Sequence, residues 1–187
     1  MNNKSANVFI RSLYSQGYSS LVMSFFKTKL TLCLTPYLGE DNRGLSQYCK
    51  KTFLSTTINH EGASFFYLTA MSILNGKDSE NQVEAVLSCS NNTSIILEYK
   101  PDQSNQMSAY LVISKNNQSI PFRFSIHQYR VSENGRVVTK VIQTGLGVFA
   151  GVLEGYLAGI GADGHLAKLQ DEHNSKQATF HHGLVSK

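Results

Sequence analysis

The chain has 187 residues, a formal net charge of +4 and a hydrophobic content of 41%, which is ordinary for a folded protein. This length fits one domain and is ample for a hydrophobic core. The positive charge is spread along the sequence without a block of five or six like charges, so the sequence gives no sign of a nucleic-acid-binding arm. We therefore expect no nucleic-acid partner.

We expect residues 1–173 to form a single α+β domain and residues 174–187 to form a flexible C-terminal tail without periodicity. Cys33, Cys49 and Cys89 are an odd number without a Cys-x-x-Cys pair, which favours buried thiols in a reducing compartment over a disulfide framework. The apolar run at residues 21–26 is followed too soon by lysines to be an export signal. We expect a cytoplasmic protein, at most peripheral to a membrane complex.

The first third of the chain has its apolar residues mostly at helical spacing. Residues 7–26 predict an amphipathic helix, weakened at Gly17. The alternating residues 30–34 predict a short strand or a continuation of the helix, and Pro36 ends either one. A loop at residues 39–44 precedes a second, short helix, which is indicated by the apolar residues Leu45, Tyr48, Cys49 and Phe53.

A third helix is predicted over residues 63–74, which are apolar on nearly every side and therefore indicate a buried element. Asn59 or Glu61 marks its start and Gly76 its end. Its run of aromatic residues is one candidate to pack on the glycine-rich segment that follows later in the chain.

After residue 78 the apolar residues alternate with a period of two, which predicts strands. The runs fall at residues 83–89, 95–99, 107–113, 120–126 and 137–141. Turn-forming residues separate them, and Asn134-Gly135 is the strongest short hairpin signal. The sequence therefore predicts an antiparallel meander of about five strands, over about residues 82–142, covered by the N-terminal helices and a long glycine-rich C-terminal helix.

That C-terminal helix has a stripe of small residues. Glycines 147, 151, 155 and 159 recur at every fourth position, and Glu154 is the only charge between residues 145 and 161. Interior glycine costs a helix about 1 kcal/mol relative to alanine, so the stripe is expected to pack closely against something. We rank three hypotheses in this order: packing on the chain's own core, binding of a partner chain, and insertion into a membrane.

No pattern in the sequence predicts a catalytic residue, a cofactor or a metal site. The glycines at 145, 147 and 151 lack the Gly-x-Gly-x-x-Gly spacing, and His60-Glu61 lacks the second histidine of a zinc-protease helix. A meeting of Asp163, His165 and His173, or metal chelation by His181-His182, has no specific ligand spacing. A polar strand face that carries Arg123, His127 and Tyr129 is a hypothesis for binding an anion or nucleic acid.

The sequence thus favours a non-enzymatic interaction module, a small adaptor or chaperone-like subunit that binds another protein through its helical surface or a sheet edge. The candidate partner-binding residues are Gly147, Gly151, Glu154, Gly155, Ala158 and Gly159. The partner is expected to be another protein chain, in a hetero-oligomer or a homodimer. Membrane association through residues 145–161 and the Arg123/His127/Tyr129 face are the alternatives.

In element order alone, with helices flanking a five-stranded antiparallel sheet, the chain resembles the chaperones and adaptors of bacterial secretion systems. The resemblance extends over much of the chain and is carried by no motif. The basic balance of this chain also departs from that group, which is typically acidic. What the resemblance implies is a protein that binds another polypeptide without catalysis.

Overall fold

The computed structural model describes residues 8–15, 17–26, 29–49, 51–76 and 81–161. Within these residues the chain forms antiparallel sheets and two helices, which confirms the α+β class. The elements are β1 (Val8–Ser15), β2 (Ser19–Phe26), β3 (Lys29–Glu40), β4 (Ser46–Tyr48), β5 (Leu54–Ile58), α1 (His60–Leu74), β6 (Val83–Cys89), β7 (Thr93–Pro101), β8 (Met107–Lys115), β9 (Gln118–Arg123), β10 (His127–Glu133), β11 (Arg136–Ile142) and α2 (Thr144–Gly161).

The chain uses one arrangement twice. In the first half, β1, β2, β3 and β5 pair in chain order, with β4 added to the far end of β3, and α1 follows. In the second half, β6, β7, β8 and β9 pair in chain order, and α2 follows after the separate β10–β11 pair. Both halves are therefore an antiparallel meander followed by a helix.

The helix predicted over residues 7–26 is wrong. Val8–Ser15 and Ser19–Phe26 form a hairpin in which β1 pairs with β2, and Gly17, with a φ of +79°, lies in the turn. The apolar residues fit a period of two equally well, because Leu21, Met23 and Phe25 all point into the core. The resemblance to secretion chaperones depends on N-terminal helices, so the structure removes its basis.

The predicted short helix between Leu45 and Phe53 is also wrong, since this segment contains β4. The side chain of Asp41 accepts hydrogen bonds from the backbone amides of Arg43 and Leu45 and turns the chain so that β4 pairs with β3. Strand β3 runs through Pro36, because Pro36 lies between the last residue that pairs with β5, Leu34, and the start of the β4 pairing.

Helix α1 confirms the helix predicted at residues 63–74 and begins three residues earlier. Asn59 caps it, since its side chain accepts a hydrogen bond from the amide of Gly62 at 3.0 Å. Gly76 has a φ of +74° and follows the helix end, as expected for a helix-terminating glycine.

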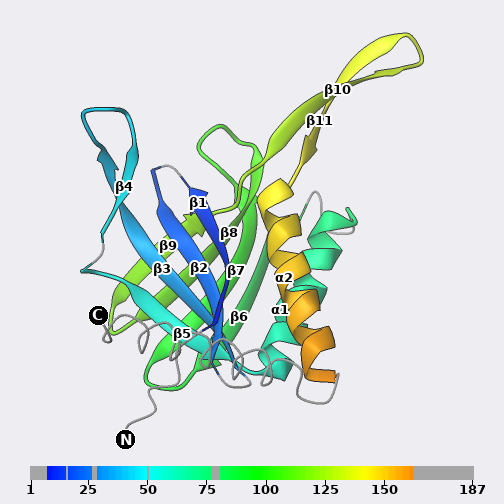
Figure 1. Cartoon of the computed structure of the whole chain (residues 1–187). Coiled ribbons are helices and arrows are strands. Elements are labelled where there is room, and N and C mark those ends of the chain that lie inside the picture. The colour runs from blue at the N-terminus through cyan, green and yellow to red at the C-terminus, as the bar shows by residue number, and fades with distance from the viewer. Residues whose placement is uncertain (1–7, 16, 27–28, 50, 77–80, 162–187) are drawn as a thin grey trace, which may run out of the picture.

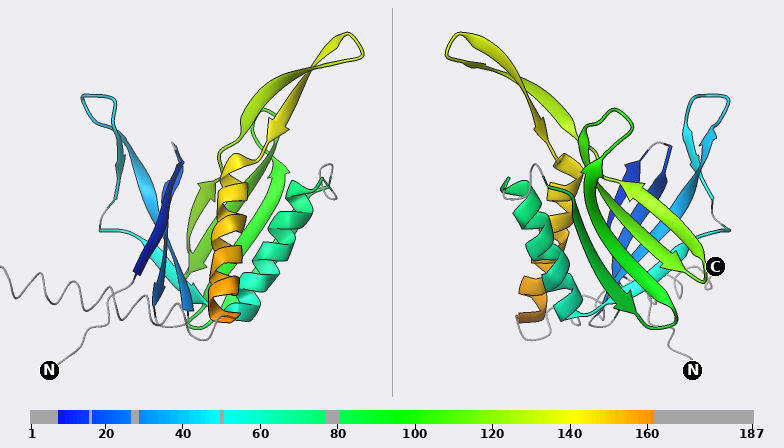
Figure 2. Two further views of the ribbon diagram at one scale, coloured as in Figure 1. Left: turned by 45° about the vertical axis from the view of Figure 1, so that its right-hand side comes forward. Right: turned by 180° about the vertical axis from the view of Figure 1, so that it is seen from behind.

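The predicted five-stranded meander is a four-stranded sheet and a separate hairpin. After β9, the chain leaves the sheet at Phe124, whose side chain turns inward and packs on Phe149 with ring centroids 5.3 Å apart. Strands β10 and β11 then pair only with each other and project from the body (Figures 1 and 2). The turn at Asn134-Gly135 is confirmed, with positive φ at both residues.

The two larger sheets face each other, and α1 and α2 lie side by side along one flank (Figures 1 and 2). One continuous hydrophobic core joins the inner faces of both sheets and both helices. Helix α2 enters this core through Leu146, Phe149, Leu153 and Tyr156, whose side chains are at most 2% exposed. This packing fixes the position of α2 and thereby decides which of its faces remains outside.

Candidate functional site

Helix α2 has one buried face and one open face. Leu146, Phe149, Ala150, Leu153 and Tyr156 are buried at spacings of three and four residues, so they form one continuous row on the helix. Gly151, Glu154, Gly155 and Ala158 are exposed, and Gly147 and Gly159 are partly exposed. The structure therefore places all six predicted partner-binding residues together on the side of α2 that points away from the core.

The glycine stripe does not pack on the chain's own core, which was the first-ranked hypothesis. A Cβ atom added at Gly147, Gly151 or Gly155 would meet no heavy atom of the described chain within 4 Å. Gly145 differs, because a Cβ there would lie 2.5 Å from the backbone nitrogen of Ser125. Internal packing therefore requires glycine at Gly145 and does not require it at Gly147, Gly151 or Gly155.

A groove runs beside this stripe, between α2 and the first sheet. It has a volume of about 330 Å³ and is mainly apolar, and its lining residues are Arg11, Phe25, Val148, Gly151, Val152, Gly155 and Tyr156. Strand β1 borders it and is an edge strand, because β1 pairs with β2 alone. The groove therefore combines the small-residue stripe of α2 with a strand that has no second pairing neighbour among the described residues.

Polar groups lie at the margins of the groove. The Tyr67 hydroxyl of α1 lies 3.5 Å from the Glu154 carboxylate, which places the only acid of α2 between the two helices. Arg11 on β1 supplies a positive charge on the other side. Burial raises the pKa of Tyr156, whose side chain also bonds to the backbone of Leu30 and so anchors the floor of the groove. The floor is fixed, and the charges are restricted to the rim.

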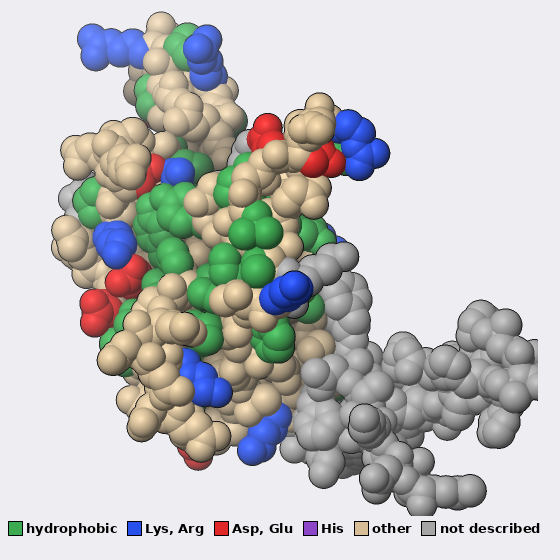
Figure 3. All heavy atoms as spheres, turned by 90° about the vertical axis from the view of Figure 1, so that its left-hand side faces the viewer, with side chains coloured by type: hydrophobic (Ala, Val, Ile, Leu, Met, Phe, Trp, Pro, Cys, Tyr) green, Lys and Arg blue, Asp and Glu red, His purple; other side chains and the backbone are tan. Residues whose placement is uncertain are grey.

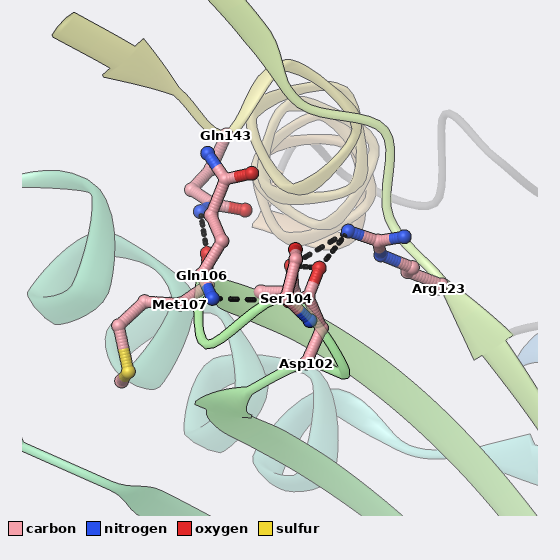
Figure 4. A network of polar contacts seen from close by, with 7 residues as sticks. Asp102, Ser104, Gln106, Met107, Arg123 and Gln143 are labelled. Carbon is pink, nitrogen blue, oxygen red and sulfur yellow. Dashed lines mark hydrogen bonds and ion pairs between the residues drawn. The ribbon is translucent and has the colours of Figure 1, made fainter.

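A second polar cluster holds the sheet to α2 and is structural. Asp102 accepts hydrogen bonds from the Ser104 hydroxyl, from the amides of Ser104 and Gln106, and from the Arg123 guanidinium (Figure 4). The Ser104 hydroxyl and the backbone amides, with the charge of Arg123, lower the pKa of the Asp102 carboxyl. Gln143 donates to the carbonyl of Met107 at 2.9 Å and fixes the start of α2 (Figure 4).

This cluster corrects the hypothesis of a polar strand face. Arg123 ends β9 and is bound to Asp102 and Ser108, whereas His127 and Tyr129 belong to the projecting β10–β11 pair. His127 bonds to the Thr144 hydroxyl at 2.7 Å, at the base of that pair. The three residues therefore do not share one face.

Among the described residues, no group of three or more His, Cys, Asp or Glu is placed to hold a metal ion. The cysteines are unpaired, but all three are partly exposed and not buried as predicted. Asp163, His165, His173, His181 and His182 lie outside the described residues, as does the predicted tail.

Comparison with family models, curated proteins and solved structures finds no match. In the part of the chain that the structure describes, neither helix is long and apolar enough to cross a membrane.

Part of the site was visible in the sequence. The regular glycines and the single acid of α2 are found from spacing alone. Arg11 and Phe25 were missed as groove residues because their segment was assigned to a helix, and only a period of two in residues 21–25 signalled the strand.

Proposed function

We propose that this protein is a non-enzymatic interaction module that binds a segment of another polypeptide in the groove between α2 and β1. The observation that carries this proposal is the open stripe of Gly147, Gly151 and Gly155, which has unfilled space above it and an apolar groove beside it. An adaptor or chaperone-like subunit is the class of protein that this surface fits best.

The physical argument begins with the cost of the glycines. Each interior glycine on an exposed helix face lowers helix stability by about 1 kcal/mol relative to alanine. Internal packing offsets this cost at Gly145 and does not offset it at Gly151 or Gly155. A partner that approaches the α2 backbone closely supplies a reason for small residues at these positions, since small residues let two backbones pack in direct contact.

The groove also defines what the partner must present. Phe25, Val152 and Tyr156 form apolar walls, so the bound segment must insert apolar side chains. A volume of about 330 Å³ holds a few such side chains and not a whole element, so most of the bound segment lies above the groove. Arg11 lines the groove from β1, and its charge favours an acidic or polar residue next to the apolar side chains of the bound segment.

Membrane insertion of residues 145–161 is a weaker proposal. Leu146, Phe149 and Leu153 are fully buried in the core, so α2 would have to leave the fold in order to enter a bilayer. Removing such side chains from a core costs several kcal/mol in total. A protein partner needs no such rearrangement, because it uses the face of α2 that is already open.

The test is the variant Gly151→Leu, compared with wild type for folding and for partner binding. Tagged protein is purified from its own cells under mild conditions, and any protein present in stoichiometric amount is identified. We expect Gly151→Leu to fold with unchanged or higher stability, because the added side chain enters open space, and to lose the partner.

Thr69→Leu is the matched control, since it adds a leucine to a partly exposed position of α1 and leaves the groove unchanged. It is expected to retain the partner. Retention of the partner by Gly151→Leu, or the absence of any stoichiometric protein from the wild-type preparation together with a monomeric state, would contradict the proposal.

A further inference from the structure

The β10–β11 ribbon, residues 127–142, has no evident structural role in the core. It projects from the body at the end opposite the C-terminal end of α2 (Figures 1 and 2), and most of its side chains are exposed. Isolated two-stranded hairpins are marginally stable in water, so a ribbon that projects into solvent needs its own stabilising contacts.

The ribbon has such contacts. Val131 and Val138 pair across it, Lys140 forms an ion pair with Glu133, and the turn at Asn134-Gly135 has the backbone conformation that twists with the strands. At its base, the Thr144 hydroxyl bonds to His127 and to the carbonyl of Ser125. These contacts therefore hold the ribbon in a defined conformation.

Positive charge is concentrated on it. The ribbon carries Arg130, Arg136 and Lys140 against the single carboxylate of Glu133, and that carboxylate is already paired with Lys140. No ion pair to Arg130 or Arg136 is found in the described part of the chain. This cluster was not recognised in the sequence, where the cations are evenly spread. It forms because β10 and β11 pair with each other away from the body.

The cations stand on both faces of the ribbon. The strand register places Arg130 on one face, with Thr139, and Arg136 and Lys140 on the other, with Tyr129. In Figure 3 basic side chains stand on two sides of the projection at the top of the molecule. Val137 is 72% exposed and Val141 is 42% exposed, and the register places both on the face of Arg130.

We propose that the β10–β11 ribbon is a second binding surface, separate from the groove, and that it inserts into the major groove of a DNA duplex. The major groove of B-form DNA, about 12 Å wide, admits a two-stranded ribbon. In this arrangement the face with Arg130, Val137 and Val141 lies toward the base edges, and the phosphate backbones run along the two strand edges, where long basic side chains can extend to them. The exposed valines meet base edges and thymine methyl groups, to which apolar side chains bind.

A second copy of the chain fits this surface less well. Two identical ribbons that paired edge to edge would bring two net positive charges together, and like charges placed close to each other are destabilising.

The test measures binding of the full-length protein to a fluorescently labelled 20-base-pair DNA duplex as a function of salt. The variant Arg130→Ala/Arg136→Ala removes two ribbon charges. Arg43→Ala/Lys51→Ala removes two exposed charges from the region of β4 and is the matched control. Circular dichroism and thermal unfolding confirm that the variants fold, and Lys140→Gln is a second ribbon variant that keeps both arginines.

We expect wild type to bind the duplex with an affinity that falls with salt, and more tightly than it binds single-stranded DNA or duplex RNA, whose major groove is too narrow for the ribbon. Loss of two phosphate contacts lowers the slope of log affinity against log salt by about 2 in the ribbon double variant. Lys140 is paired with Glu133, so Lys140→Gln is expected to change the slope less than the loss of the two arginines does. The control keeps the wild-type slope.

Other outcomes overturn the proposal. These are no binding of the duplex at low salt, an equal loss of binding in the control, and binding of single-stranded DNA that the ribbon variants leave unchanged. A change in protein association without a change in DNA binding in the ribbon variants would assign the ribbon to a protein contact, and so would also refute it. None of these outcomes bears on the groove, whose residues are unaltered.

Discussion

Two kinds of glycine occur in helix α2, and they differ in what surrounds them. Gly145 lies against the backbone of Ser125, to whose carbonyl its amide donates at 2.8 Å, so no larger residue fits there. Gly151 and Gly155 have open space where a side chain would be. The first glycine is explained by the fold, and the others need an explanation from outside the described chain.

This difference predicts opposite signs for the same substitution. Gly151→Ala and Gly155→Ala are each expected to raise the free energy of unfolding by about 1 kcal/mol, because alanine favours the helix and meets no neighbour. Gly145→Ala is the control on the same helix, and we expect it to lower the free energy of unfolding, because its Cβ would overlap Ser125. Urea unfolding followed by circular dichroism measures all three. Destabilisation by all three alike would show that the stripe is packed.

Tyr110 provides a pH-dependent test of the sheet–turn contact. Burial, together with the neighbouring Tyr18 ring 5.9 Å away, raises the pKa of Tyr110 to about 12. In the unfolded chain the same phenol has a pKa near 10. The contribution of Tyr110 to stability is therefore fully present below pH 10 and is lost as the pH rises from about 10 to about 12.

Absorbance at 295 nm follows this ionisation directly. We expect Tyr110 of the folded protein to ionise at about pH 12, and Tyr110→Phe to lower the absorbance change in that range by the contribution of one tyrosine. Tyr129→Phe, on the exposed ribbon, is expected to leave that part of the absorbance change as it is in wild type. The same absorbance change near pH 12 in Tyr110→Phe as in wild type would contradict the placement of Tyr18 against Tyr110.

Among the helices and strands, the predictions from sequence were most accurate where the apolar residues fitted a single periodicity. The four strands from β6 to β9, helix α1 and helix α2 were found at nearly the right places, because their apolar residues fit one period only and the turns contain Asn or Gly. Residues 7–26 are so rich in apolar residues that both periods fit. There, Gly17 takes a positive φ in the turn of the hairpin, which sequence spacing does not report.

Contacts between elements that are far apart in the sequence explain why part of the candidate site was not predicted. The groove needs β1 beside α2, and these two elements are separated by most of the chain. Spacing identifies a stripe on one helix and does not identify what lies next to it. Likewise, the departure of β10 from the sheet depends on Phe124 packing onto Phe149, a contact between segments that local pattern does not reveal.

The whole molecule is two sheet-and-helix units around a single core, with the two proposed binding surfaces at its margins. Core formation uses the inner faces of both sheets and one face of each helix. It leaves the glycine face of α2 with the β1 edge on one flank, and the β10–β11 ribbon at an end (Figure 2). We interpret the compact part as a scaffold that holds two separate binding surfaces in fixed positions.

The central claim is that the glycine face of α2 is open in the free protein and is covered by a partner polypeptide. The most direct measurement is the rate at which a thiol reagent labels Gly155→Cys in a chain in which Cys33, Cys49 and Cys89 are serine. Labelling in the isolated protein is expected to be nearly as fast as that of a thiol in an unstructured peptide, and to become slow in the complex with its partner. Slow labelling of the isolated, folded monomer would show that the chain covers this face itself, and would contradict the account.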